Sequence, residues 1–165
     1  MVDNEIIGQR ILENRNKLYA LAYSIIGHPE DAEDAVGNAI IKAFMHKEDI
    51  KKDDSIDAWL YSIVNREAYG ILRTRKPIVS LDENENLCSR DIISEKVDKL
   101  YIWDVVSQMD EKYRGIVYLY YGLQMDTHQI SKIVGIPQGT VRTRLKRARE
   151  ILRVTLEEGG EVDAK

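Results

Sequence analysis

The sequence is short of the residues from which disulfides and metal sites are built. Its 165 residues include one cysteine, Cys88, and three histidines. A single cysteine excludes an internal disulfide and a cysteine-based zinc site. His28, His46 and His128 lack the spacing of metal ligands and are interpreted as surface or loop-end residues. We therefore expect no metal and no cofactor.

Long apolar runs and catalytic motifs are also missing. No apolar run approaches the roughly 20 residues that a membrane-spanning helix needs. The first residues lack the basic and apolar pattern of a signal peptide. These absences predict a soluble, cytoplasmic chain without membrane insertion of its own. No nucleophile with its base, metal cluster or phosphate loop can be assembled from the motifs, so an enzyme is not expected.

Strand patterns are missing as well. No segment sustains an alternation of apolar and polar residues, whereas nearly every ordered segment has apolar residues at helical spacing. Between residues 77 and 96 the periodicity stops and the composition becomes polar and acidic. The sequence thus predicts an all-α protein of two small helical domains, residues 1–76 and 97–157, with a flexible linker at 77–96 and a disordered tail at 158–165.

The strongest positive signal is a pair of helices joined by a tight turn. Asp126 can cap the first helix with Gln129 three residues further on, and Gly135 can adopt the left-handed conformation that ends it. Pro137 suits the start of a second helix, and residues 138–149 carry five basic side chains and no acidic one. The pattern is typical of a helix-turn-helix that enters the major groove, although a basic helix face can also be merely solvated.

Charge is segregated along the chain. There are 24 basic and 28 acidic residues, a net charge of -4, whereas a protein that simply coats DNA is basic. Acidic residues gather at 30–34 and 82–98, and basic residues at 73–76 and 142–153. The acidic stretches indicate a second partner that is not DNA.

An acidic helix begins at Pro29. Its apolar stripe faces a core, and its opposite face aligns Asp34, Asn38 and Ile41. A single exposed isoleucine is ordinary. Beside the acidic cluster, however, Ile41 indicates a protein interface.

A third helix follows the capping residue Ser55. Its outer face repeats Tyr61, Asn65 and Tyr69, and three basic residues follow. Aromatic rings stack on unpaired bases, an amide pairs with a base edge, and basic residues hold phosphates. The other interpretation is a tyrosine pair half-packed beneath the preceding loop. The predicted single-strand face comprises Tyr61, Asn65, Tyr69, Arg73, Arg75 and Lys76.

Four segments in this order resemble the extracytoplasmic function (ECF) group of bacterial RNA polymerase sigma factors: residues 29–36, 58–65, 113–114 and 139–149. The resemblance covers about residues 18 to 156. It implies an alternative sigma factor that binds core RNA polymerase, directs it to specific promoters and promotes DNA melting. It also implies two helical domains, and commonly an anti-sigma partner, although control by expression alone stays open.

The resemblance assigns three binding surfaces. The acidic helix would bind the clamp helices of the polymerase β′ subunit through Asp31, Glu33, Asp34, Asn38 and Ile41. The single-strand face would capture the non-template strand of the minus ten element. The second domain would hold the β flap on one face and read the minus thirty-five duplex through Gly139, Thr140, Arg142, Thr143, Lys146 and Arg147.

Departures from the family pattern concern two of these surfaces. Gly37 and Asn38 stand where the family usually has Gln and Glu, and a mid-helix glycine costs about 1 kcal/mol relative to alanine. Tyr69 replaces a frequent Asp. Two other functions remain open on the residues alone: a freestanding helix-turn-helix regulator, which usually adds a ligand or dimerisation domain, and an interaction module, which would leave the basic helix without a task.

Overall fold

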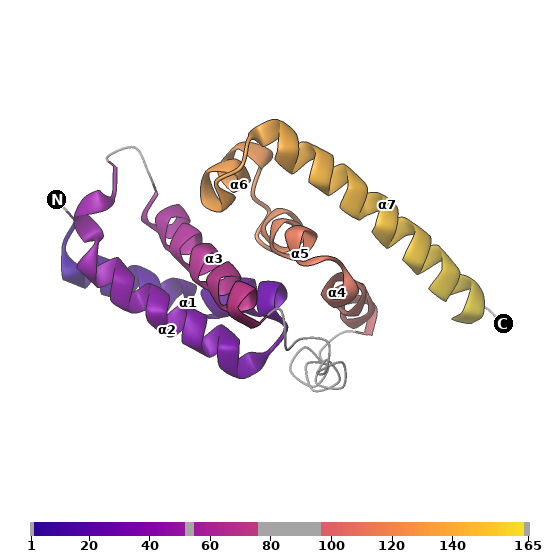
Figure 1. The fold of residues 1–165 in the computed structure, drawn as a ribbon, viewed down its shortest axis with the longest axis horizontal. Coiled ribbons are helices and arrows are strands. Elements are labelled where there is room, and N and C mark those ends of the chain that lie inside the picture. The colour runs from indigo at the N-terminus through magenta and orange to yellow at the C-terminus, as the bar shows by residue number, and fades with distance from the viewer. Residues whose placement is uncertain (1, 52–54, 76–96, 164–165) are drawn as a thin grey trace.

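The computed structural model describes residues 2–51, 55–75 and 97–163, and within these ranges its regular structure is helical (Figure 1). Lys76 and the predicted linker lie outside the described residues. The all-α prediction is confirmed. In chain order the elements are α1 (Asn4–Ile26), α2 (Pro29–Met45), the 3-10 helix η1 (Lys47–Asp49), α3 (Ile56–Arg75), α4 (Val97–Gln108), α5 (Glu111–Val117), the π-helical turn η4 (Tyr118–Gly122), α6 (Thr127–Val134) and α7 (Gln138–Asp163).

The first domain is a bundle of α1, α2 and α3. Gly27 ends α1 in the left-handed conformation, with φ of 75°, and its amide donates to the Tyr23 carbonyl. Pro29 then occupies the first turn of α2, where its missing N–H is not needed. A stripe of small side chains faces the bundle and lets α2 lie close to its neighbours: Ala32, Ala35, Ala39 and Ala43 are buried.

The second domain contains the predicted helix-turn-helix, formed by α6 and α7. The Asp126 carboxylate accepts a hydrogen bond from the backbone amide of Gln129 at 2.8 Å. In return, Gln129 Oε1 accepts one from the backbone amide of Asp126 at 3.1 Å. This is the predicted capping box. Gly135 follows α6 with φ of 74°, and α7 starts at Gln138 after Pro137. The short-range signals in the sequence therefore placed both ends of the turn correctly.

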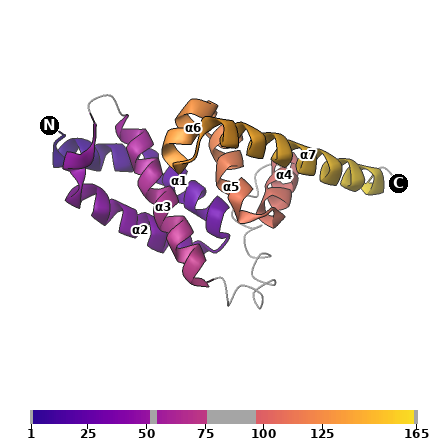
Figure 2. The ribbon, with the colours of Figure 1, turned by 45° about the horizontal axis from the view of Figure 1, so that its top comes forward.

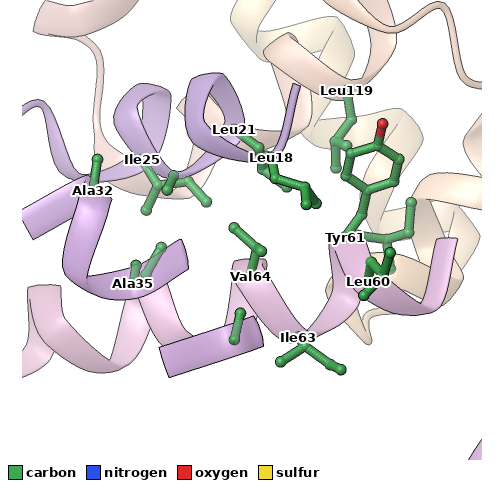
Figure 3. Close-up of a cluster of buried hydrophobic side chains, with 14 of the residues drawn as sticks. Leu18, Leu21, Ile25, Ala32, Ala35, Leu60, Tyr61, Ile63, Val64 and Leu119 are labelled. Carbon is green, nitrogen blue, oxygen red and sulfur yellow. The ribbon is translucent and has the colours of Figure 1, made fainter. Parts of the chain in front are cut away.

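The two domains pack directly against each other. Helix α6 packs next to α3 in both ribbon views, and α5 packs on α1 (Figures 1 and 2). Ile116 and Leu119 of the second domain belong to the same buried cluster as Leu18 and Tyr61 of the first. The close-up shows Leu119 next to Tyr61 (Figure 3). The predicted two-domain division holds along the sequence, but the larger hydrophobic cluster spans both domains, and a smaller one lies within the second domain.

Two helix ends differ from the expectation. Helix α7 continues to Asp163, whereas the sequence predicted a disordered tail from residue 158. The predicted stop at Gly122 has a different mechanism, because Gln124, with φ of 56°, takes the left-handed conformation after η4. Gly122 instead leaves room for a ring: a Cβ there would lie 2.8 Å from the Tyr118 ring. Among the described helices, none has both the length and the apolar character needed to cross a bilayer.

Candidate nucleic-acid and polymerase interface

The start of α7 presents a basic face to solvent. Val141, Leu145 and Ala148 are buried and fix the inner face of the helix. The residues predicted to read the duplex therefore point away from the core, as the helical spacing requires. Of these, Thr140 is half-buried, and the exposed ones are Gly139, Arg142, Thr143, Lys146 and Arg147.

Side-chain hydrogen bonds join α6 to the start of α7 and to the turn between them. The side-chain amide of Gln138 donates to the Thr127 hydroxyl at 2.8 Å. The Ser131 hydroxyl donates to the Ile136 carbonyl within the turn at 2.6 Å. The first bond joins the start of α7 to the start of α6, and the second joins α6 to the turn that follows it. The predicted recognition surface thus starts from a turn that is fixed by its own hydrogen bonds.

The predicted outer face of α3 is covered, which corrects the sequence analysis. Tyr61 is 3% exposed and Asn65 is 6% exposed, and Tyr69 is half-buried. The expectation that these side chains face solvent is wrong in this structure. The second domain covers them, because α6 packs next to α3 and Leu119 reaches Tyr61.

Tyr61 belongs to a buried polar network of the first domain. Its hydroxyl donates to Asn14 Oδ1 at 2.8 Å, and Asn14 Nδ2 donates to Asp57 Oδ1 at 2.9 Å and to the Arg10 carbonyl at 2.8 Å. Burial, with the nearby Asp57 charge, raises the pKa of the Tyr61 phenol above its usual range. The phenol is thus neutral and serves as a hydrogen-bond donor within the core.

Tyr69 links the two domains. Its hydroxyl donates to the Glu111 carbonyl at the start of α5, at 2.8 Å. Burial raises the pKa of Tyr69 to about 12, although the positive charges of Arg114 and Arg144 oppose the increase. Arg144 therefore lies close enough to the α3 phenol to act on it from α7. A second link is the Arg114 guanidinium, which donates to the Ile25 carbonyl at 2.5 Å and to the Ser107 carbonyl at 3.3 Å.

A cavity of about 390 Å³ lies beside Tyr69, between the two domains. Asn65 lines it without a hydrogen-bonding partner for its buried Oδ1. The sequence predicted a nucleic-acid contact for Arg73 but not for the other basic residues of the wall, because most of them come from other helices and no local pattern connects them. Those residues are Arg66, Lys112, Lys132 and Arg144.

The acidic face of α2 is largely as predicted. Glu33, Asp34 and Asn38 are exposed. Ile41 is 60% exposed, and Met45, one turn further, is 71% exposed, so the apolar part of this face is larger than the sequence analysis recognised. The face therefore combines carboxylates with exposed aliphatic side chains.

Asp31 corrects the predicted set. It is 6% exposed, and its carboxylate pairs with Arg75 Nη1 at 2.5 Å. Asp31 therefore does not belong to the exposed surface, and Arg75 of the predicted single-strand face is engaged by it. This ion pair joins the start of α2 to the end of α3 and therefore lies within the first domain.

These surfaces define a helical DNA-binding protein that carries a separate face for a protein partner. Comparison with known families assigns both domains. Residues 11–78 match the family described as Sigma-70 region 2, and residues 99–152 match Sigma-70, region 4. The chain belongs to the ECF group of the sigma-70 family, whose members direct RNA polymerase to promoters.

Relatives of known name agree with this assignment. RNA polymerase sigma factor SigV of Bacillus subtilis (strain 168) is 30% identical over 150 residues, covering 88% of this chain and 88% of the relative. ECF RNA polymerase sigma factor SigW of the same strain is 29% identical over 157 residues, covering 86% and 84%. In fold, the chain is similar to the sigma factor RpoE from Bartonella quintana, solved with the anti-sigma factor NepR, with a TM-score of 0.73, 22% identity, and coverage of 91% of this chain and 96% of that one. A sigma factor is not an enzyme, so the sites are binding surfaces.

Proposed function

We propose that this sigma factor binds core polymerase through α2, reads the minus thirty-five duplex through α7, and captures the minus ten strand on α3 once the domains separate. The observation that carries this proposal is the contrast between two of its surfaces. The basic face of α7 is open to solvent, whereas the polar face of α3 is covered by the second domain. Duplex binding can therefore precede strand capture.

The duplex surface has both kinds of contact that recognition requires. Arg142 and Thr143 lie in the first turns of α7, from which a helix in the major groove reaches base edges. Lys146 and Arg147 follow one turn later and can neutralise phosphates. Arg147 Nη1 lies 3.4 Å from the Glu150 carboxylate, an exposed pair that phosphate can replace at little cost.

The polymerase surface is the exposed face of α2. Glu33 and Asp34 supply charge, and Ile41 and Met45 supply apolar area for the β′ clamp helices. Gly37 lies in the middle of this face, and a Cβ there would have no neighbour within 4 Å. Packing therefore does not require a glycine at this position. Gly37 lowers the stability of α2 by about 1 kcal/mol relative to alanine.

Strand capture needs Asn65 and Tyr69 to become accessible. Unstacking a base costs a few kcal/mol, and each base stacked on an aromatic side chain returns about 1 to 3 kcal/mol. Arg73 is exposed at the end of the same face and can hold a phosphate. Tyr61 we assign to the core rather than to the strand, because its hydroxyl is held by Asn14.

The remaining partners follow from the relatives. The structure of Bartonella quintana RpoE contains an anti-sigma factor, and we extend to this chain a protein inhibitor of that kind. The β flap would bind the second domain on a face away from the recognition surface. We place the action of this protein in the cytoplasm, where polymerase and promoters are.

The test is transcription of fragmented genomic DNA by sigma-free core polymerase, with every new RNA start mapped. Discrete starts that share two upstream motifs are expected. Asn65→Ala should reduce permanganate-detected melting while duplex affinity is unchanged, since the amide acts only on the open strand. Thr74→Ala, an exposed position on the same helix, is the control. Normal melting in Asn65→Ala would contradict strand capture on α3, and footprints without new starts would contradict the whole mechanism.

A further inference from the structure

The cavity between the domains has the size of a small-molecule site. Its volume is about 390 Å³, within the range of roughly 300 to 1,000 Å³ typical of ligand pockets. One wall is α3 of the first domain, and the opposite walls come from α5, α6 and α7 of the second. The cavity therefore exists only while the domains are packed together.

Positive charge dominates its lining. The described part of the lining has five basic residues and one acidic residue, Glu111. Like charges brought together across an interface repel, and a bound anion reverses the sign of that contribution. The basic residues are Arg66 and Arg73 on α3, Lys112 on α5, Lys132 on α6 and Arg144 on α7.

Asn65 adds a side-chain amide to the lining. It is 6% exposed, and its Oδ1 has no hydrogen-bonding partner. Leaving a buried polar atom unpaired is costly, and such an atom calls for an explanation. A carboxamide offers one donor and one acceptor edge, which is the pattern that a nucleobase complements. The Tyr69 ring lies in the same wall.

We propose that the interdomain cavity binds a nucleoside triphosphate, with the base against Asn65 and Tyr69 and the phosphates among Lys112, Lys132 and Arg144. A ligand that binds only the closed form stabilises that form in proportion to its concentration. Occupancy therefore holds the domains together and keeps α3 covered. Nucleotide and promoter strand then compete for Asn65.

This competition rests on the strand-capture proposal, but the binding site itself does not. Binding is measured on the full chain alone, without polymerase or DNA, by equilibrium dialysis against labelled ATP, GTP, CTP and UTP. One saturable site per chain is expected for at least one of them. Absence of saturable binding for all four would overturn the site, whatever the transcription assay shows.

Charge variants locate the ligand. Lys132→Gln and Lys112→Gln each remove one exposed cation of the wall, and each should weaken binding about tenfold, the usual effect of losing one charge-assisted contact. Lys17→Gln changes an exposed lysine of α1 away from the cavity and should leave binding unchanged. Equal effects of Lys17→Gln and Lys132→Gln would reduce the binding to nonspecific charge attraction and overturn the proposal.

Two further measurements test the base and the closed form. Inorganic tripolyphosphate should bind more weakly than the nucleotide, and equal affinity would overturn the assignment of a nucleotide. A Cβ at Gly115 would lie 3.0 Å from Ile25 across the domain interface. Gly115→Val should therefore separate the domains and abolish binding, whereas Gly37→Val, at a position where a Cβ would have no neighbour within 4 Å, should preserve it. Full binding by an open Gly115→Val chain, with opening confirmed by small-angle scattering, would contradict an interdomain site.

Discussion

The phenol of Tyr69 donates a hydrogen bond of 2.8 Å to the backbone carbonyl of Glu111. Tyr69 lies on α3, and Glu111 is the first residue of α5. The bond therefore joins the face predicted to capture a DNA strand to the domain that carries the recognition helix. In the structure, the Tyr69 side chain bridges the two domains, whereas the proposed strand capture requires it to be free.

Tyr69→Phe should open this interface while retaining the ring. The lost hydrogen bond contributes about 0.5 to 1.5 kcal/mol, so the ratio of closed to open chains should fall roughly twofold to tenfold. Hydrogen exchange of the α3 amides, or fluorescence transfer between labels on the two domains, measures the change. Tyr121→Phe, at an exposed tyrosine, is the control. An unchanged closed fraction would show that the bond does not hold the domains.

Alkaline pH should open the domains through the same residue. Burial raises the pKa of Tyr69 from its ordinary value of 10.0 to about 12. The closed form therefore retains its full contribution from Tyr69 below about pH 10 and loses it as the pH rises towards 12. The closed fraction is followed from pH 8 to 12 by fluorescence transfer. Tyr69→Phe should lack this component of the opening, and identical profiles for both chains would contradict the assignment.

Tyr61→Phe should destabilise the first domain without affecting its surface. The substitution leaves Asn14 Oδ1 buried without its donor, which costs about 1 to 3 kcal/mol. Urea unfolding of the full chain measures the loss of stability. Tyr121→Phe again serves as the exposed control. If Tyr61→Phe were as stable as the parent chain but defective in strand capture, Tyr61 would be a DNA-binding residue after all.

Arg142→Ala should reduce promoter discrimination. A side chain that reads a base edge contributes about 1 to 3 kcal/mol to specificity, whereas a phosphate contact lowers affinity for all sequences alike. Affinities for a cognate and a scrambled minus thirty-five duplex distinguish the two roles. Arg153→Ala lies further along α7, exposed and outside the recognition turns, and should have little effect on discrimination. Equal loss on both duplexes would assign Arg142 to the backbone.

Asp126→Ala should destabilise the second domain by about 1 kcal/mol, because it removes the acceptor of the capping box on α6. Thermal unfolding is a suitable measurement. Asp3 provides a matched control, since it precedes α1 at the equivalent position but makes no capping hydrogen bond through its side chain. A similar loss in Asp3→Ala would mean that charge near the helix end, rather than the cap, is responsible.

The sequence by itself determined the features that depend on neighbouring residues. Gly27, Pro29, Asp126 and Gly135 set helix ends through their own backbone preferences and caps, so these positions were predictable from local chemistry. The inner face of α7 followed from its helical spacing, and the exposed basic residues followed from that face. The helix-turn-helix and the all-α class needed no knowledge of tertiary packing.

Tertiary structure decided which polar surfaces stay exposed. Helix α3 has one strongly apolar face, and its second face, with Tyr61 and Asn65, looked solvent-facing because the helical period places it away from that apolar face. Docking of the second domain buries that face, and no helical period predicts a contact between residues such as Tyr69 and Glu111, 42 positions apart. The pair of Asp31 with Arg75 and the basic wall of the cavity arise in the same way, since each joins residues from different helices. Periodicity specifies a helix's faces, whereas what covers each face depends on how the other helices pack.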